Sequence, residues 1–283
     1  MISNTVIIGD CAFDTNKFCV KGIFEENIKT NLGGSLVYAS IPASLFFGVS
    51  VVSNVGYDFP IEKFKKYNID TKGIKIYKEE KTTRFYNELK SFDGQERETK
   101  VEYNKNLIVK FEDIPHEYLN AKYFHIATMN PKAQLELVKQ IRANTEAIIS
   151  VDTIEGYDRL PETLEVFDIV DIAFIDKEFQ SLLDCKAKTK IIKLGKTGCE
   201  YINKDKKITA KSRVINNVVD KTGAGDCQNG VFINLISHGV GVEKALNLSV
   251  KVASLSILDY GIFNLRNRIK NSKDFQEMVD KSR

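Results

Sequence analysis

The sequence predicts an α/β protein whose mostly parallel central sheet is covered by helices on both faces. The first observation is alternation, because short apolar runs typical of strands are separated by segments with apolar residues at helical spacing. Such alternation produces βαβ units, in which parallel strands are buried on both sides. The second observation is length, since 283 residues can bury a large core and α/β proteins of this size are often one domain.

The predicted elements follow one another along the chain. Strands are expected at 5–9, 49–55, 123–127, 147–151, 169–175 and 190–194, and helices at 38–47, 61–67, 132–143, 226–237 and 242–259. Ligands of such sheets bind beyond the carboxyl ends of the strands. Gly9 ends a predicted strand, and Asp152 and Gly195 each follow one, so this edge of the sheet is the expected site.

Two polar segments interrupt the alternation. Residues 17–31 and 82–103 have polar and apolar residues in alternation, and the second contains the turn sequence FDGQ at 92–95. Neither segment has the pattern of a core element. We expect them to form a small sheet that projects from the domain as a lid.

Composition excludes several classes of function. A net charge of +3, with basic and acidic residues intermixed, gives no electrostatic reason to expect nucleic acid or a membrane as a partner. No apolar run has transmembrane length, and no signal peptide is expected. The cysteines (11, 19, 185, 199 and 227) show no CxxC and no regular spacing, which favours free thiols in the cytoplasm. The histidines are isolated, so a histidine-based zinc site is not expected.

The segment VDKTGAGD at 219–226 is the strongest functional motif. It directly precedes a predicted helix, where uncovered N–H groups and the helix macrodipole favour an anion. Gly223 and Gly225 free the backbone to approach a phosphate closely. Asp226, in the predicted first turn, can accept a proton. An anion site beside a base is what phosphoryl transfer to a hydroxyl requires, although the motif alone also fits a tight turn followed by an acid.

Two further glycine- and acid-containing segments lie near the amino terminus. Gly33 and Gly34 precede a predicted helix and let backbone N–H groups meet a polar ligand, or they form a plain loop-to-helix turn. Asp10 and Asp14 follow the first strand, where carboxylates can accept hydrogen bonds from vicinal hydroxyls or remain solvated. The usual nucleotide fingerprints are absent, because a GxGxxG motif needs glycine where Gln228 stands and a P-loop needs it at Lys190.

In this order the motifs resemble those of the ribokinase-like (PfkB) family of sugar and nucleoside kinases. The resemblance is carried by Gly9 to Asp14, Gly33-Gly34, VGYD at 55–58, KLGKTG at 193–198 and VDKTGAGD at 219–226. It implies a three-layer α/β/α fold with a small β lid. It also implies one kinase domain over residues 1–283, with lid segments at about 15–32 and 81–104.

The resemblance also implies roles for individual residues. Asp226 would be the catalytic base, and the amides of Gly223, Ala224 and Gly225 would form the anion hole for the phosphates of ATP. The remaining roles are acceptor binding by Asp14, Gly33, Gly34 and Tyr38; ATP binding by Lys193, Gly195 and Gly198; Mg²⁺ held through water by Glu178; and a monovalent cation, K⁺, near Asp220.

Three residues depart from the family pattern. Ile175 replaces the asparagine that begins the family's magnesium motif. Tyr38 replaces an asparagine of ribose-specific members and cannot offer an amide's paired donor and acceptor, which argues against ribose. Lys221 replaces a threonine and is either an added cation near the phosphates or a solvated lysine. Tyr38 and Tyr57 favour a nucleoside or another ring-bearing acceptor.

The expected function is ATP-dependent phosphoryl transfer to a hydroxyl of a small polyhydroxylated acceptor: a sugar, a cyclitol or a nucleoside. The alternative is a nucleotide- or metabolite-binding protein of the same fold that has lost catalysis, which the departure at Ile175 motivates. A third hypothesis is a cysteine-dependent enzyme that uses Cys227 at the helix start. Arg84 in the lid either clamps an anionic substrate group or faces solvent. A homodimer through the lid is plausible by the same resemblance.

Overall fold

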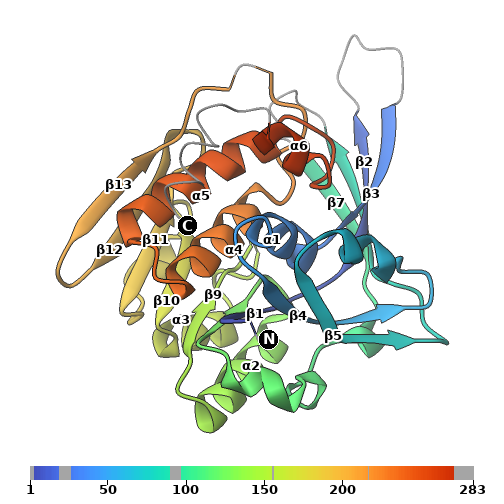
Figure 1. Ribbon diagram of the computed structural model, residues 1–283, viewed down its shortest axis with the longest axis horizontal. Coiled ribbons are helices and arrows are strands. Elements are labelled where there is room, and N and C mark those ends of the chain that lie inside the picture. The colour runs from blue at the N-terminus through green and yellow to red at the C-terminus, as the bar shows by residue number, and fades with distance from the viewer. Residues whose placement is uncertain (1–2, 19–26, 90–96, 155, 216, 271–283) are drawn as a thin grey trace.

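The central element is a sheet of nine strands (Figure 1). The computed structural model describes residues 3–18, 27–89, 97–154, 156–215 and 217–270. The seven strands β11, β10, β9, β8, β1, β4 and β5 pair in parallel, and β12 and β13 add an antiparallel hairpin at one edge. In sheet order the strands are β13 (Lys207–Lys211), β12 (Gly198–Asn203), β11 (Thr189–Lys193), β10 (Ile172–Asp176), β9 (Ile148–Val151), β8 (Tyr123–Ile126), β1 (Thr5–Ile8), β4 (Val49–Gly56) and β5 (Ile69–Tyr77).

Helices cover both faces of this sheet. One layer holds α1 (Ser35–Ala43), α4 (Ala224–Ser237), α5 (Val242–Ser256) and α6 (Leu265–Lys270), and the other holds α2 (Pro131–Asn144) and α3 (Pro161–Ile169). Because neighbouring side chains of a strand point to opposite faces, Ile7 packs in the core under the first layer, whereas Val6 and Ile8 pack under the second. The predicted three-layer α/β/α arrangement is confirmed.

A second sheet of four strands projects beside the carboxyl edge of the first (Figure 1). Its order is β3 (Asn27–Gly33), β2 (Ala12–Phe18), β6 (Arg84–Leu89) and β7 (Arg97–Glu102). The pair β2–β6 is parallel, and the other two pairs are antiparallel. This is the small β sheet expected from the two polar segments. The turn predicted at 92–95 lies outside the described residues.

Several predicted boundaries differ from the structure. The helix expected at 61–67 is a 3₁₀ helix, Ile61–Lys66, which buries only Phe64 and therefore has no apolar stripe to sustain an α-helix. Helix α1 begins at Ser35, three residues earlier than expected, because Gly34 lets the chain turn with φ 85°. Residue 169, the expected start of a strand, is the last residue of α3, which the prediction missed.

Candidate active site

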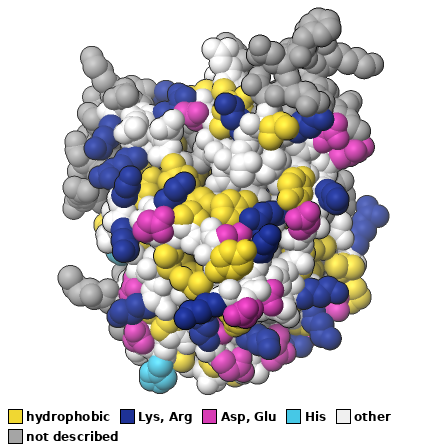
Figure 2. Space-filling model, turned by 90° about the vertical axis from the view of Figure 1, so that its right-hand side faces the viewer, with side chains coloured by type: hydrophobic (Ala, Val, Ile, Leu, Met, Phe, Trp, Pro, Cys, Tyr) yellow, Lys and Arg dark blue, Asp and Glu magenta, His cyan; other side chains and the backbone are white. Residues whose placement is uncertain are grey.

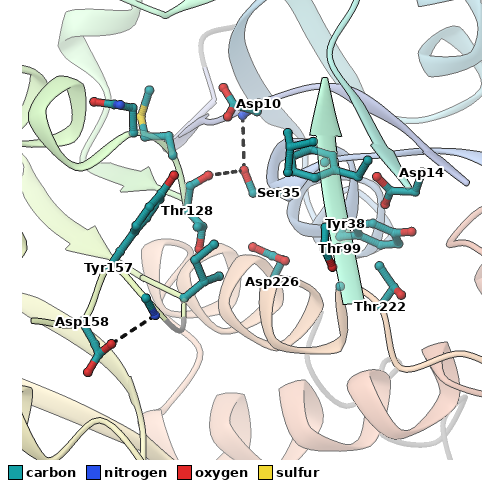
Figure 3. A pocket seen from close by; sticks show the side chains of 18 of the residues that line it. Asp10, Asp14, Ser35, Tyr38, Thr99, Thr128, Tyr157, Asp158, Thr222 and Asp226 are labelled. Atoms are coloured by element: carbon teal, nitrogen blue, oxygen red, sulfur yellow. Dashed lines mark hydrogen bonds between the residues drawn. The ribbon is translucent and has the colours of Figure 1, made fainter. Parts of the chain in front are cut away.

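A cavity of about 1280 Å³ lies where the carboxyl edge of the central sheet, the small sheet and the start of α4 meet (Figure 3). The central sheet and the loops after it contribute Asp10, Thr128, Met129, Tyr157 and Asp176 to the wall, and the small sheet with the residue after it contributes Asp14, Phe85, Asn87, Thr99, Val101 and Tyr103. The starts of α1 and α4 contribute Gly34, Ser35, Tyr38, Thr222, Gly223 and Asp226. The structure therefore brings the amino-terminal acids and the carboxy-terminal motif into one site.

The glycine loop before α4 adopts a backbone conformation that requires glycine at position 223. Gly223 has φ 72°, in the left-handed region, and a Cβ there would lie 2.0 Å from the ring of Tyr38. Within the described residues, the N–H groups of Gly223 and Gly225 donate to no protein acceptor, whereas the Ala224 N–H donates to the Lys221 carbonyl at 3.2 Å. Two of the three amides expected to form the anion hole are therefore directed at no other group, and the third closes a turn.

Asp226 lies in the first turn of α4, with its side chain in the middle of the cavity view (Figure 3). Its Oδ1 is buried and has no hydrogen-bond partner in the described part of the chain. Burial raises the pKa of this carboxyl to about 8, the negative charges of Asp152 and Asp14 add to the rise, and Lys193 opposes it. A carboxyl with a pKa near the working pH, facing an open cavity, is suited to accept a proton from a bound hydroxyl.

A buried ionic cluster lies directly beneath the glycine loop. The Nζ of Lys193 is 2.9 and 3.0 Å from the two carboxylate oxygens of Asp152 and 3.1 Å from Asp176. Asn229 on α4 donates to the same Asp152 carboxylate at 2.6 Å. Lys193 is 7% exposed and does not line the cavity, so the structure places it in this cluster rather than on the wall expected to bind ATP.

The predicted acceptor side is tightly built. The Asp14 carboxylate rests against Gly33, where a Cβ would lie 2.0 Å from Oδ2. Gly34 has φ 85°, and a Cβ there would lie 2.3 Å from the Asp10 carbonyl, so this position requires glycine, whereas a side chain at position 33 would displace the Asp14 carboxylate. Tyr38 is 3% exposed, and burial together with nearby carboxylates, Asp14 first, holds its pKa well above the usual range. Its hydroxyl therefore stays protonated and can donate a hydrogen bond.

The cavity has an apolar and aromatic wall that the motifs did not identify. It consists of Phe85, Val101, Tyr103, Met129 and Tyr157. The Tyr103 hydroxyl is buried, has no partner in the described residues, and has a pKa raised chiefly by burial. Period-2 alternation in residues 82–103 was the signal that could have identified Phe85, Val101 and Tyr103, since alternate side chains of a strand face the same side.

Tyr57 and Asp10, which the sequence analysis also considered, have different surroundings. Tyr57 is 56% exposed and does not line the cavity, so it gives no support for a ring-bearing acceptor. Asp10 does line the cavity, and burial raises the pKa of its carboxyl to about 7. Its N–H donates to the Ser35 hydroxyl at 3.2 Å, and that hydroxyl donates to the Thr128 carbonyl at 2.8 Å (Figure 3).

The carboxylates near the end of β10 could bind a Mg²⁺ ion whose other ligands are mainly phosphate oxygens. Glu178 and Asp176 both line the cavity, and their side chains are 66% and 37% exposed. Mg²⁺ needs only one or two carboxylates when substrate phosphates complete its shell, and no group of three or more acidic, His or Cys side chains suited to a metal occurs in the described ranges. Ile175 is fully buried in the core, so its side chain takes no part.

Asp220 is held by nitrogen donors. Its Oδ2 accepts from Asn16 Nδ2 at 2.8 Å, and its Oδ1 accepts from the Thr222 N–H at 2.9 Å. Gly195 and Gly198, expected on the ATP side, do not line the cavity. Gly198 has φ 115° and would bring a Cβ within 2.0 Å of the Ala210 carbonyl, which accounts for glycine there by chain packing.

Three other sequence candidates are placed by their contacts. Arg84 binds Asp58 at 2.6 Å and the Thr82 carbonyl at 2.8 Å, so it joins the base of the small sheet to the end of β4 and does not face solvent freely. Lys221 is exposed. Cys227 is fully buried, and burial raises the pKa of its thiol, which argues against the cysteine-dependent enzyme of the third hypothesis because such an enzyme needs a reactive thiolate.

Comparison with known proteins decides the family. Residues 3–266 match the model of the pfkB family carbohydrate kinases. The chain belongs to this family. As a PfkB kinase it is a phosphotransferase that acts on a hydroxyl of a sugar or nucleoside with ATP as the donor.

Relatives and solved structures agree with this family. The chain is 25% identical to a cytidine kinase of Thermococcus kodakarensis over 283 residues, covering 92% of this chain and 98% of that protein. It is 26% identical over 227 residues to a nucleoside kinase of Methanocaldococcus jannaschii, covering 73% and 72%. The crystal structure of a nucleoside kinase of Methanocaldococcus jannaschii shares the fold with a TM-score of 0.79, 20% identity and 99% coverage of both chains. A Burkholderia thailandensis nucleoside kinase in complex with inosine gives 0.78, 15%, and 91% and 92% coverage.

No helix in the described part of the chain combines the length and the apolar character that crossing a membrane requires.

Proposed function

We propose that this PfkB kinase transfers the γ-phosphoryl group of ATP to a hydroxyl of a nucleoside. The choice of acceptor rests on the residues that line the cavity. The carboxylates of Asp14 and Asp226 lie on one part of the wall, and the apolar and aromatic side chains lie on another. Ribose hydroxyls suit the first, and the faces of a nucleobase suit the second. The names of the relatives, a cytidine kinase and a nucleoside kinase, support the same acceptor class.

The protein groups account for the steps of the reaction. Asp14 accepts hydrogen bonds from acceptor hydroxyls and fixes their orientation. Asp226 takes the proton of the attacking hydroxyl, and the Gly223 and Gly225 N–H groups stabilise the charge that develops on the phosphoryl oxygens. Glu178 and Asp176, which line the cavity, would hold Mg²⁺ together with the phosphates of ATP, and the ion would neutralise part of that charge.

Several finer features belong to the same proposal. Residues 1–283 form one kinase domain, and the sheet β3-β2-β6-β7 is its lid, which excludes water during transfer. K⁺ binds near Asp220, which a dependence of the rate on KCl against NaCl would test. Ile28 and Val101 of the small sheet are exposed, and the side of the molecule shown in Figure 2 has apolar side chains among charges of both signs, so we also propose a homodimer through the lid, which sedimentation would test. We place the protein in the cytoplasm.

The test is ADP release measured with a panel of acceptors at equal concentration. Cytidine, uridine, adenosine and inosine represent nucleosides; ribose, fructose and myo-inositol represent the other candidate acceptors; and ribose 5-phosphate represents a charged one. We expect a nucleoside to have the highest kcat/KM, and Asp226→Asn protein purified in the same way controls for contaminating kinases. A sugar or cyclitol with a higher kcat/KM than every nucleoside would contradict the acceptor assignment.

The panel also separates the kinase from the alternative of a binding protein that has lost catalysis. The apolar Ile175 in place of the family's asparagine is the observation that favours this alternative. It predicts binding of ATP with no ADP release for any acceptor.

A further inference from the structure

A line of hydrogen-bonded side chains connects the small sheet with the loop that precedes α4. Thr99 Oγ1 donates to Asn87 Oδ1, Asn87 Nδ2 donates to Asn16 Oδ1, and Asn16 Nδ2 donates to Asp220 Oδ2, each at 2.8 Å. The other oxygen of Asp220 accepts the Thr222 N–H at 2.9 Å. Asn16, Asn87 and Asp220 are at most 5% exposed, and Thr99 lies on the cavity wall. We call this line the relay.

The relay crosses the small sheet at a single level. Asn16 pairs with Asn87, and Asn87 pairs with Thr99, in the register of β2, β6 and β7. The neighbouring level on the same face consists of Asp14, Phe85 and Val101, which also pair with one another in register. All three of these line the cavity. Any molecule that contacts this neighbouring level therefore contacts the strands that carry the relay, two residues away.

The direction of every hydrogen bond in the relay follows from its last member. Both groups that face Asp220 are N–H donors, so the carboxylate accepts from each. This turns the amide nitrogen of Asn16 toward Asp220 and its oxygen toward Asn87. The Asn87 oxygen is then left to accept from Thr99. Hydrogen bonds in such a chain polarise one another, so the members act as a unit.

At its other end the relay is fixed to the glycine loop. The Asp220 carboxylate bridges Asn16 of the small sheet and the backbone of Thr222, the residue just before Gly223. In the cavity view Thr99, Tyr38, Asp14 and Thr222 lie together beside Asp226 (Figure 3). A displacement of β2 relative to α4 therefore stretches the Asn16–Asp220 bond and disturbs the N–H groups that follow Thr222.

We propose that Asn16 and Asn87 are positioning residues that make acceptor binding at the small sheet and phosphate binding at the glycine loop depend on each other. The inference rests on the proposed function, because it needs an acceptor and ATP in the same cavity. Coupling of this kind is reciprocal: the acceptor increases the affinity for ATP by the same factor as ATP increases the affinity for the acceptor.

The experiment measures this factor by binding. Calorimetry gives the Kd of a non-hydrolysable ATP analogue with Mg²⁺, with and without a saturating nucleoside. In the parent protein we expect the nucleoside to tighten binding by about 5- to 150-fold, the usual range of coupling between sites. In Asn16→Leu, which removes both hydrogen bonds of that amide at similar volume, we expect a factor close to one.

Two further variants separate the relay from general loosening of the sheet. Thr99→Val removes only the first hydrogen bond, at an exposed residue, and decides the question if Asn16→Leu does not fold. We expect it to lower the factor at least twofold. Thr15→Val is the control, because Thr15 is adjacent to Asn16 on β2 but pairs with Thr30 on the other, exposed face at 3.0 Å. It should keep the parent factor.

The outcomes distinguish the two levels of the proposal. A parent protein that binds neither nucleoside nor ATP analogue overturns the proposed function and this inference with it. Binding of both ligands without coupling in the parent overturns this inference alone. The same holds for an unchanged factor in Asn16→Leu and Thr99→Val, or for an equal loss in Thr15→Val.

Discussion

Replacing Lys193 by methionine should destabilise the protein strongly, because it leaves carboxylates buried without their cation. The Lys193 side chain is 8% exposed and its Nζ lies 2.9 Å from Asp152, whose side chain is 4% exposed. Removing one partner of such a buried pair costs about 3–5 kcal/mol of unfolding free energy. With a urea m-value of about 3 kcal/mol/M, the unfolding midpoint should fall by at least about 1 M.

The matched control is the exposed ion pair of Lys139 and Glu165. Its N–O distance is 2.7 Å, but the two side chains are 48% and 50% exposed, so Lys139→Met should cost at most about 1 kcal/mol. Burial raises the pKa of Asp176 and Lys193 opposes that rise, so without Lys193 this carboxyl takes up a proton more readily and the loss should be smaller at pH 5 than at pH 8. Equal unfolding midpoints for the two variants would refute the argument that burial, rather than distance, determines the value of the Lys193 pair.

Four further predictions concern the cavity. Asp226→Asn should lower kcat by about 10²–10⁴-fold while the Kd of an ATP analogue stays within a few-fold, and near-normal ADP release would show that this residue is not the base. Because a base must be deprotonated and burial raises the pKa of Asp226 to about 8, kcat/KM should increase about tenfold per pH unit below pH 8 and level off above it; a flat profile from pH 6 to 9 would contradict this. Gly223→Ala should lower the free energy of unfolding and the affinity for ATP more than Gly239→Ala does, as measured by unfolding and calorimetric titrations. Both glycines have positive φ, but only at Gly223 would a Cβ lie 2.0 Å from the Tyr38 ring. Tyr103→Phe removes a buried hydroxyl that has no partner in the described residues, so the free energy of unfolding should change little. The KM for the nucleoside should increase about 2- to 12-fold through the loss of one hydrogen bond. An unchanged KM would show that this hydroxyl does not contact the acceptor.

The central fold could be predicted because its signal is local. Strands β1, β4, β8, β9 and β11 are short apolar runs, most of them buried on both faces, and each was expected from its own residues. The hairpin β12–β13 and the strand β5 were missed, since they lie at the two edges of the sheet and keep polar, exposed residues. Their positions depend on pairing with a neighbouring strand, which an apolar pattern does not encode.

The site divides in the same way. The glycine loop and Asp226 could be located from eight consecutive residues, because a helix start is defined by its immediate sequence. The Lys193 cluster and the relay could not, since Asp152 is 41 residues from Lys193 and Asn16 is 204 residues from Asp220. Nothing local marks Asn16 as different from any polar residue of an exposed strand. Only the register of β2 with β6 and the position of Asp220 give it a role.

The charged groups around the cavity restrict the net charge of the acceptor, as its apolar wall restricts the acceptor's shape. Among the described residues, its lining includes six carboxyl groups (Asp10, Asp14, Asp158, Asp176, Glu178 and Asp226) but one cationic side chain, Arg159, which is 88% exposed. Lys193, beneath the loop, is already paired with two carboxylates. An acceptor that carried its own phosphate would add negative charge where the protein offers little to balance it, whereas ATP arrives with Mg²⁺. The proposed reaction therefore favours a neutral polyhydroxylated acceptor with an apolar ring, and a nucleoside meets both requirements.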